Sequence, residues 1–325
     1  MLTSTLLRFI FPPPSSLFIT VMSVFSFTST AYLGFSELRG KHAPYSKFWN
    51  GSSTKSGTRK QTEVSSRKGM LFSYTPAFLA CLTSFVLLAP QGTRFLLLRS
   101  ALTLHFFKRI FEVLFVHKYS GGMVLDLVIL ISLSYFTITA TIIYSLHLTQ
   151  GISEPPVDLK YLGVLLFLIG IGGNFYHHYL LSELRGKSDK EYRVPKGGLF
   201  CLVICPHYLF EIIGFLGISC ISQTLYAFSF TLGSALYLMG RSYATRRWYL
   251  SLFKGRHFHE KLLQEALFKS LYRRILYREF GWTLLLVLWV WPLQEHQIIC
   301  VFVLLRCSIF CINTSHMLLD MSLDC

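Results

Sequence analysis

The sequence predicts an all-α fold, a polytopic membrane helical bundle of about seven transmembrane helices with an extra helix or hairpin in the C-terminal tail. Two observations carry this prediction. The chain of 325 residues is 52% hydrophobic, with 16% aromatic residues and a mean hydropathy of +0.48, which is too apolar for soluble domains. It also contains apolar windows of ~20 residues, the length that a helix needs to cross a bilayer with its backbone groups satisfied internally.

The expected spans follow one another along the chain between polar or proline-containing segments. They cover residues 16–36, 70–90, 93–117, 123–148, 158–183, 199–220 and 224–240, and a further apolar stretch lies within 281–312. The first span follows three prolines and lacks a small-residue cleavage site, so we interpret it as an anchor that is retained. Span 93–117 is interrupted by charged residues, and we expect such a helix to face a cavity or to lie partly in the membrane interface.

The net charge of +15 is explained by membrane topology. Residues 37–69 carry eight Lys or Arg and residues 184–198 carry five, whereas residues 149–157 and 221–223 carry none. This alternation is the positive-inside pattern, and it predicts that the basic loops are cytoplasmic. No nucleic-acid partner is expected, because the basic residues form no recognition helix.

The chain is expected to have three regions. Residues 1–92 form an N-terminal transmembrane region with a cytoplasmic linker at 50–69, which is rich in Ser, Thr, Lys and Gly. Residues 93–253 hold the remaining spans with most of their polar residues. Residues 254–325 change character, from a basic amphipathic stretch to an apolar hairpin or span.

Three of the predicted helices carry polar residues at helical spacing, on one face each. These residues are Asn174, His178 and Arg185, then His207 and Glu211, and then Arg241, Thr245 and Tyr249. A charge at mid-membrane costs ~2.5–3.5 kcal/mol on insertion scales, so Glu211 and Arg241 are expected to face a shared polar cavity. Alternatively, these residues form pairs that only stabilise the packing of the helices and have no role in binding or catalysis.

The spacing of the residues does not fit a dinucleotide-binding or a metal-binding motif. GIGGN at 170–174 lacks the third glycine and the strand of a dinucleotide fingerprint, so we expect its small residues to let two helices approach. The adjacent His177 and His178 point ~100° apart on a helix, and no HExxH spacing exists. We therefore expect no metal site, and hydrolase or NTPase motifs are lacking as well.

Five ordered motifs carry a resemblance to a known family: LHFFKRIFEVLFVHKYSGG at 104–122, GNFYHHYLLSELR at 173–185, EYRVPKGGLF at 191–200, CPHYLFEII at 205–213 and GRSYATRRWYLSLF at 240–253. Over roughly residues 1–253 the chain resembles the steroid 5α-reductase (3-oxo-5-alpha-steroid 4-dehydrogenase) family, which includes very-long-chain enoyl-CoA reductases and polyprenal reductases. The resemblance makes 93–253 the catalytic domain. It implies an NADPH-dependent oxidoreductase of the endoplasmic reticulum membrane, acting on the C=C bond of an α,β-unsaturated lipid carbonyl such as a 3-oxo-4-ene steroid, with the mouth of its site cytoplasmic.

The resemblance also assigns residues to the cofactor. The family's NADPH-binding positions fall on Asn174, Arg185, Tyr192, Glu211, Arg241 and Tyr249. His178 is expected to bind the cofactor as well, although it stands where the family has an aspartate, and Thr245 stands where the family has a histidine.

The catalytic positions depart further from the family pattern. The Gln-Glu pair that contacts a steroid ketone is replaced by Ser73-Tyr74, and a tyrosine is replaced by Phe106. The chemistry needs a donor for the carbonyl oxygen as enolate charge develops. Tyr74, His207 and Tyr208 are the candidates for that donor, and Glu211 matches the family glutamate near the nicotinamide; the sequence leaves the choice of donor open.

Several alternatives remain at this level. The chain could be a very-long-chain enoyl-CoA or polyprenal reductase of the same family, an isoprenylcysteine-type membrane methyltransferase, or a non-catalytic membrane protein. The expected partners are a lipid or steroid substrate and the bilayer. The segment KGRHFHEKLLQ at 254–264 replaces the short acidic, proline-containing ending of the family, so the residues that close the family's pocket are altered.

Overall fold

The computed structural model describes residues 7–42, 62–89, 92–119, 121–184 and 195–252. Contacts along the chain separate two units. The larger is Phe9–Ala244, and the described part of the other consists of residues 7–8 and 245–252. The bundle described below belongs to Phe9–Ala244, whereas the expected tail helix or hairpin within 281–312 lies outside the described residues.

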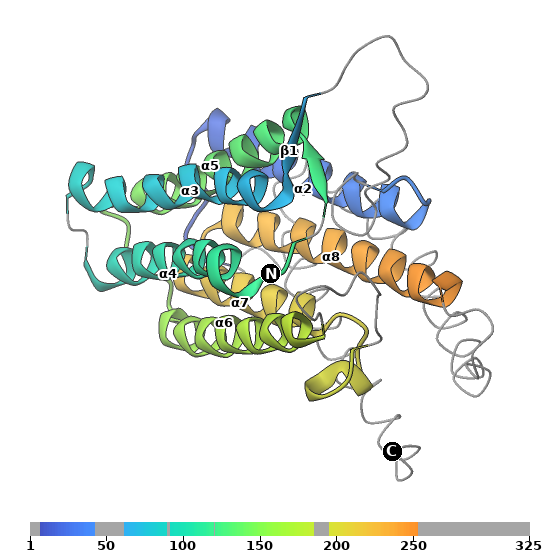
Figure 1. Ribbon diagram of the computed structural model, residues 1–325. Coiled ribbons are helices and arrows are strands. Elements are labelled where there is room, and N and C mark those ends of the chain that lie inside the picture. The colour runs from blue at the N-terminus through green and yellow to red at the C-terminus, as the bar shows by residue number, and fades with distance from the viewer. Residues whose placement is uncertain (1–6, 43–61, 90–91, 120, 185–194, 253–325) are drawn as a thin grey trace. The chain divides into compact units, whose positions relative to one another are not determined.

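Seven long helices occur in the part of the chain that the structure describes (Figure 1). They are α2 (Leu17–Leu38), α3 (Ser66–Leu87), α4 (Gly92–Phe111), α5 (Leu125–His147), α6 (Lys160–Glu183), α7 (Pro206–Ser222) and α8 (Leu225–Leu252). A π-helical turn, η3 (Glu112–Val116), extends α4, and a short 3-10 turn, η4 (Gly198–Cys201), precedes α7. The predicted all-α bundle is therefore confirmed.

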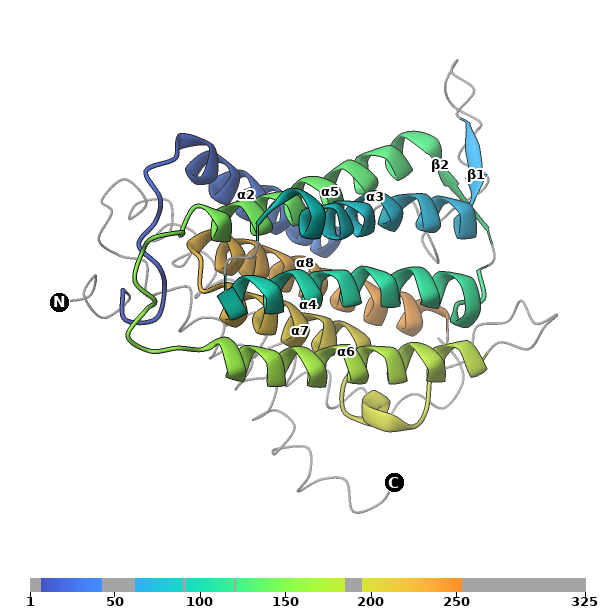
Figure 2. The same ribbon diagram turned by 90° about the vertical axis from the view of Figure 1, so that its left-hand side faces the viewer.

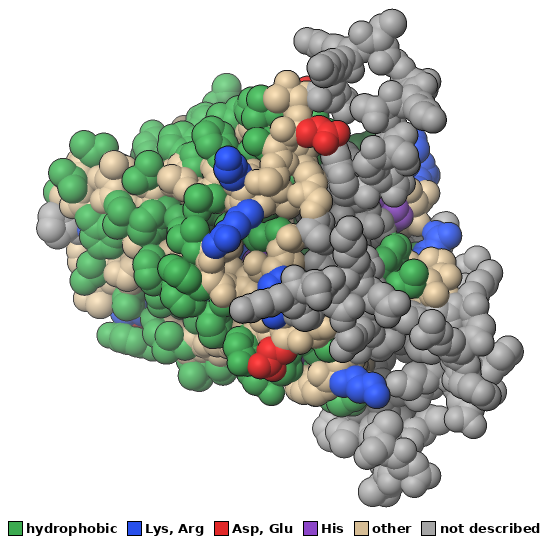
Figure 3. Space-filling model, viewed as in Figure 1, with side chains coloured by type: hydrophobic (Ala, Val, Ile, Leu, Met, Phe, Trp, Pro, Cys, Tyr) green, Lys and Arg blue, Asp and Glu red, His purple; other side chains and the backbone are tan. Residues whose placement is uncertain are grey.

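Four of these helices are long and apolar enough to cross a membrane, namely α2, α3, α5 and α6, at 22 to 24 residues each. α7 is apolar but has only 17 residues. Large apolar side chains such as Phe72, Phe107 and Phe115 are exposed on the surface, and hydrophobic side chains cover much of the face seen in Figure 3. Such a surface suits contact with lipid, and the chain is a multi-pass membrane protein, as predicted.

α4 lies between two pairs of helices (Figure 2). It contacts α3, which packs along α5, and it also contacts α6 and α7, which pack along each other. Strands β1 (Glu63–Ser65) and β2 (Gly122–Val124) form an antiparallel pair that joins the starts of α3 and α5. Consequently, the side chains of α4 meet residues of α3 on one side and residues of α6 on the other.

Two helices begin at positions that differ from the expected ones, for local reasons. α3 begins at Ser66, inside the expected linker, because the Ser65 side chain caps its first turn and β1 fixes the preceding residues. α7 begins at Pro206 and not at residue 199, because proline fits the first helical turn. Cys205 directly before it has a non-helical backbone, with φ −130° and ψ 68°, so the turn η4 does not continue into α7.

Glycines bring α6 and α7 into close contact, as the GIGGN segment led us to expect. A Cβ atom placed on Gly170 would collide with the backbone of Gly214, and one placed on Gly217 would collide with the backbone of Phe167. Small residues at this seam let the two backbones touch. The close approach sets Asn174, one turn after Gly170, directly against α7.

Candidate functional site

α4 turns its charged face inward. Arg94, Arg99, His105 and Lys108 are buried, although each is polar or charged. Leu104, Phe107 and Phe111 lie on the opposite face and are exposed. A helix with this inverted pattern must have polar partners inside the bundle, because an unpaired charge in an apolar interior is costly.

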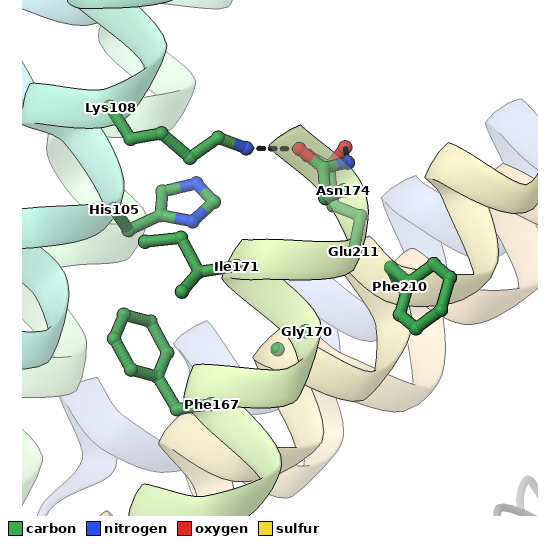
Figure 4. A pocket seen from close by; sticks show the side chains of 9 residues that line it. His105, Lys108, Phe167, Gly170, Ile171, Asn174, Phe210 and Glu211 are labelled. Atoms are coloured by element: carbon green, nitrogen blue, oxygen red, sulfur yellow. Dashed lines mark hydrogen bonds between the residues drawn. The ribbon is translucent and has the colours of Figure 1, made fainter. Parts of the chain in front are cut away.

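Lys108 finds such partners on α6 and α7. Its ammonium group donates to Oδ1 of Asn174, as the dashed line in Figure 4 shows. Nδ2 of Asn174 in turn donates to the backbone oxygen of His207 at 2.7 Å and lies 3.4 Å from Oε2 of Glu211. The buried Asn174 thus joins a cation of α4 to a carboxylate of α7.

These residues line a small pocket, which Figure 4 shows at close range. Its cavity volume is about 10 Å³, room for about one water molecule, whereas pockets for drug-sized ligands have ~300–1,000 Å³. The walls combine polar and apolar side chains with two helix glycines: His105, Lys108, Phe167, Gly170, Ile171, Asn174, Phe210, Glu211 and Gly214. A larger ligand therefore needs the helices or side chains around this space to move.

A second polar cluster centres on Glu112, which has no exposed surface. Its Oε1 accepts from Nδ1 of His178 at 2.9 Å and from Nζ of Lys108 at 3.2 Å, and its Oε2 lies 3.3 Å from Nη1 of Arg109. Glu112 is also the first residue of the π-helical turn. Such turns often occur at functional sites, because they redirect side chains.

Tyr74 of α3 joins this cluster through Arg109. Nη2 of Arg109 lies 2.6 Å from the phenol oxygen, and the guanidinium lies 5.0 Å from the ring centroid. Arginine has five N–H donors and no acceptor, so Tyr74 must accept this hydrogen bond. Its own hydroxyl proton has no acceptor among the described residues, although the side chain is only 2% exposed.

Glu112, His117 and His178 bring potential metal ligands within 4.8 Å of one another. However, the carboxylate already lies beside the positive charges of Lys108 and Arg109. A divalent cation at this point would be repelled by both, since like charges at ~4 Å interact by several kcal/mol in a protein interior. The charges therefore favour a network closed by protein groups.

Two adjacent histidines have separate roles, as their helical spacing predicted. The Nε2 atom of His177 accepts from the backbone N–H of Leu199 at 3.1 Å. Its Nδ1 atom must then carry the proton that is donated to the backbone oxygen of Gly173 at 2.7 Å. His177 holds the turn before α7, whereas His178 faces Glu112.

The other predicted site residues lie as follows. The ring of His207 lies near those of Tyr208 and His178, with centroids 4.3 and 5.3 Å away, respectively, and both pairs are tilted. Arg241 forms an ion pair of 2.5 Å with Glu37 of α2. Tyr249 belongs to the smaller unit, and Arg185 and Tyr192 lie outside the described residues.

Sequence reasoning assigned no site role to Lys108, Arg109 or Glu112. The signal was present, because three ionisable residues at i, i+1 and i+4 interrupt an apolar segment. Their spacing indicated that this helix faces a polar environment inside the bundle. It could not show that Tyr74 lies beside Arg109 or that His178 lies beside Glu112.

Comparison with known proteins finds a family similar to the later part of the chain. Residues 125–265 match the family model described as 3-oxo-5-alpha-steroid 4-dehydrogenase. This match includes Asn174, His178 and Glu211 but begins after Tyr74 and the polar residues of α4.

Individual relatives agree with that assignment. The chain is 36% identical over 134 residues to a very-long-chain enoyl-CoA reductase of Dictyostelium discoideum, covering 41% of this chain and 44% of the relative. It is 38% identical over 98 residues to 3-oxo-5-alpha-steroid 4-dehydrogenase 2 of Macaca fascicularis, covering 30% and 39%. It is 39% identical over 92 residues to steroid 5-alpha-reductase DET2 of Gossypium hirsutum, covering 28% and 36%.

The chain thus matches about two fifths of the length of these curated relatives. Four of the motifs that indicated this family, at 173–185, 191–200, 205–213 and 240–253, lie within the matched residues, whereas the motif at 104–122 precedes them. Residues 125–265 of the chain are thus similar to the 3-oxo-5-alpha-steroid 4-dehydrogenase family.

Proposed function

We propose that this chain reduces the C=C bond of an α,β-unsaturated lipid carbonyl, with NADPH as the reductant. The names of its relatives support a reaction of this kind, because one is an enoyl-CoA reductase and two are steroid reductases or dehydrogenases. A 3-oxo-4-ene steroid, a long-chain enoyl-CoA and a polyprenal all present the required conjugated carbonyl. We propose this shared group, and not one acceptor, as the recognised feature.

The observation that carries the proposal is the hydroxyl proton of Tyr74. Arg109 donates to the phenol oxygen, and no described residue accepts the proton of that hydroxyl. A buried donor without a protein partner costs free energy unless a ligand or water uses it. The carbonyl oxygen of a bound lipid is a suitable acceptor, so Tyr74 is our candidate among the three donors that the sequence left open.

The reaction adds two hydrogens across the double bond. When bound, reduced nicotinamide supplies a hydride equivalent for the β carbon, and a proton from solvent completes the α carbon. Negative charge develops on the carbonyl oxygen between these events, and the Tyr74 hydroxyl stabilises it by a hydrogen bond. Arg109 in turn stabilises the charge that the phenol oxygen gains as its proton is shared.

The polar groups around the pocket have the chemistry that a nicotinamide carboxamide requires. Asn174 offers both an N–H donor and a carbonyl acceptor, Glu211 offers an acceptor, and Lys108 offers a donor. We propose that Asn174, His178 and Glu211 contribute to cofactor binding from α6 and α7. Arg185, Tyr192, Arg241 and Tyr249 are proposed for the same cofactor on the strength of the sequence motifs alone.

We further propose that the protein resides in the endoplasmic reticulum membrane with its basic loops in the cytoplasm. The charge asymmetry between residues 37–69 and residues 149–157 supports this orientation. Protease added to sealed microsomes should then cleave within 43–61. Protection of that segment until detergent is added would reverse the proposed orientation.

The reaction is tested with the full chain in microsomes or nanodiscs. NADPH consumption and product mass are followed with each of the three acceptors, and a product heavier by two hydrogens is expected from at least one. Absence of such a product with all three would overturn the proposal. Methyl transfer from S-adenosylmethionine to an isoprenylated cysteine would instead indicate the methyltransferase alternative.

Replacing Tyr74 by Phe tests the proposed donor. The substitution keeps the ring but removes the hydroxyl, and we expect kcat to fall by about 10²- to 10³-fold, the usual effect of losing one oxyanion donor. Tyr144→Phe, on the exposed part of α5, serves as the matched control and should leave kcat unchanged. Equal activity of both variants would exclude Tyr74 as the donor.

A further inference from the structure

We infer that Arg109 is a positioning residue, which orients the Tyr74 hydroxyl toward the substrate and is itself held by Glu112. This inference rests on the proposed function and adds residues that neither the family match nor the predicted site contains. Arg109 and Glu112 both lie before residue 125, where the family match begins. Their role follows from contacts between α3, α4 and α6.

The first step concerns the direction of the Tyr74 proton. A phenol can donate or accept, so a tyrosine beside another tyrosine or a serine could point its proton toward the protein. The Tyr74 proton cannot point toward Arg109, whose Nη2 lies 2.6 Å away, because the guanidinium has only N–H donors. Arg109 thus donates to a lone pair of the Tyr74 oxygen, and the Tyr74 O–H points away from Arg109.

The second step concerns the position of Arg109 itself. Its Nη1 atom lies 3.3 Å from Oε2 of Glu112, while its Nη2 atom donates to the Tyr74 hydroxyl oxygen. The guanidinium is planar, so fixing one nitrogen fixes the direction of the other. Glu112 therefore determines where Arg109 points its second nitrogen.

The third step concerns what keeps Glu112 in place. His178 of α6 and Lys108 of α4 both donate to its other oxygen, at 2.9 and 3.2 Å. The carboxylate is consequently held from two helices and cannot rotate away from Arg109 without losing both bonds. His178, which replaces a family aspartate, thereby acts together with a carboxylate from α4.

Aromatic side chains pack around the ring of Tyr74. Tyr135 of α5 lies between Tyr74 and Phe106, with ring centroids 5.3 and 5.8 Å away. Phe106 has no hydroxyl at the position where the family has a tyrosine. The chain thus couples a phenol on α3 to an arginine on α4.

A double-mutant cycle tests the inference, because it separates positioning from general damage. Arg109→Lys keeps the charge but loses the planar fork, so it cannot hold Tyr74 and Glu112 in the same geometry. With Tyr74 present, we expect kcat to fall by about tenfold to a hundredfold, the range for a charged hydrogen bond. The KM for the acceptor should stay within about threefold, because the interaction strengthens only as charge develops.

In the Tyr74→Phe background, the same Arg109→Lys change should have little further effect on kcat. Arg99→Lys is the matched control, since Arg99 is another buried arginine of α4, bonded to the backbone oxygens of Ser84 and Leu88 outside the site. It should leave kcat of the folded protein unchanged. If Arg109→Lys does not yield folded protein, Glu112→Asp is used in its place. It should lower kcat when Tyr74 is present and have little further effect on kcat in the Tyr74→Phe background.

The outcomes are distinct. A wild-type chain that reduces none of the three acceptors overturns the proposed function. If the wild type is active, two results overturn only the positioning role. Arg109→Lys, or Glu112→Asp in its place, either leaves kcat unchanged or lowers it equally in the Tyr74 and the Tyr74→Phe backgrounds.

Discussion

At the scale of single residues, the cation–carboxylate balance of α4 explains how charges are accommodated inside an apolar bundle. Lys108 and Arg109 are adjacent and buried or nearly so, and Glu112 lies one turn later with both oxygens engaged. Glu211 adds a second carboxylate, which reaches Lys108 through Asn174. These two cations thus have two carboxylates nearby.

Removing the charge of Glu112 should therefore destabilise the protein strongly. Glu112→Gln keeps the shape but leaves Lys108 and Arg109 facing each other in a buried environment, and breaking a buried pair in this way costs about 3–5 kcal/mol. The thermal melting temperature in detergent measures the effect. Glu154→Gln, at a half-exposed carboxylate, is the control and should change it much less; a similar small shift for both would contradict the buried network.

At the scale of elements, the contact between α6 and α7 determines how near Asn174 lies to Glu211. The two helices meet at glycines, and neither seam position has room for a side chain. Because Asn174 follows Gly170 by one turn, spacing at the seam is transmitted to the pocket. A separation of the two helices would break the contacts of Asn174 with α7.

Gly170→Val should accordingly lower both stability and activity. Its side chain would collide with the Gly214 backbone, and overpacking of this kind costs about 1–3 kcal/mol. Gly172→Ala on the same helix has open space around its new methyl group and should be neutral or slightly stabilising. Melting temperatures of the two variants test the seam, and equal values would show that it tolerates side chains.

At the scale of the whole bundle, α4 connects two polar regions. Arg94 at its start and Glu112 at its end are 18 residues apart, which corresponds to about 27 Å along a helix. Arg94 donates to Asp158, Glu154 and Gln223, at 2.7 to 3.1 Å. Gln223, in the turn between α7 and α8, also accepts from the backbone N–H of Leu159 at 2.8 Å, so this region joins several connections of the bundle.

This second region makes stability depend on pH. The Arg94 hydrogen bond holds the pKa of Glu154 below its ordinary value. Partial burial raises the pKa of Asp158, but hydrogen bonds from Lys160 and the charges of Arg94 and Lys160 together outweigh it and lower this pKa. A carboxylate with a lowered pKa in the folded state stabilises it above the unfolded pKa, and this contribution is lost as the pH falls through the folded value. The loss is thus expected below about pH 4, in the carboxyl range.

The corresponding experiment compares melting temperatures at pH 7 and pH 3. The melting temperature of the wild type should be lower at pH 3 than at pH 7. Asp158→Asn should make this difference smaller, because it lowers the melting temperature at pH 7. Glu63→Gln, at an exposed residue of β1, serves as the control. If Asp158→Asn and the control show the same pH dependence, the Arg94 cluster does not contribute.

The sequence alone predicted much of the bundle, because membrane helices are specified locally. An apolar segment of sufficient length must form a helix, since its backbone groups have no other partner in lipid. The positions of α2, α5 and α6 were expected to within a few residues for that reason. The starts of α3 and α7 were less accurate, because a strand pairing and a proline determined them.

The sequence therefore determined the class of the protein, its helices, its family motifs and the fact that charged residues on α4 need polar partners. Only the tertiary structure decided which partners those are: Tyr74 for Arg109 across 35 residues and His178 for Glu112 across 66. It likewise decided that Arg241 pairs with Glu37 across 204 residues. The physical reason is the range of the interactions. Hydropathy and helix period act within one segment, whereas a hydrogen bond between two helices depends on how both are placed and rotated in the bundle.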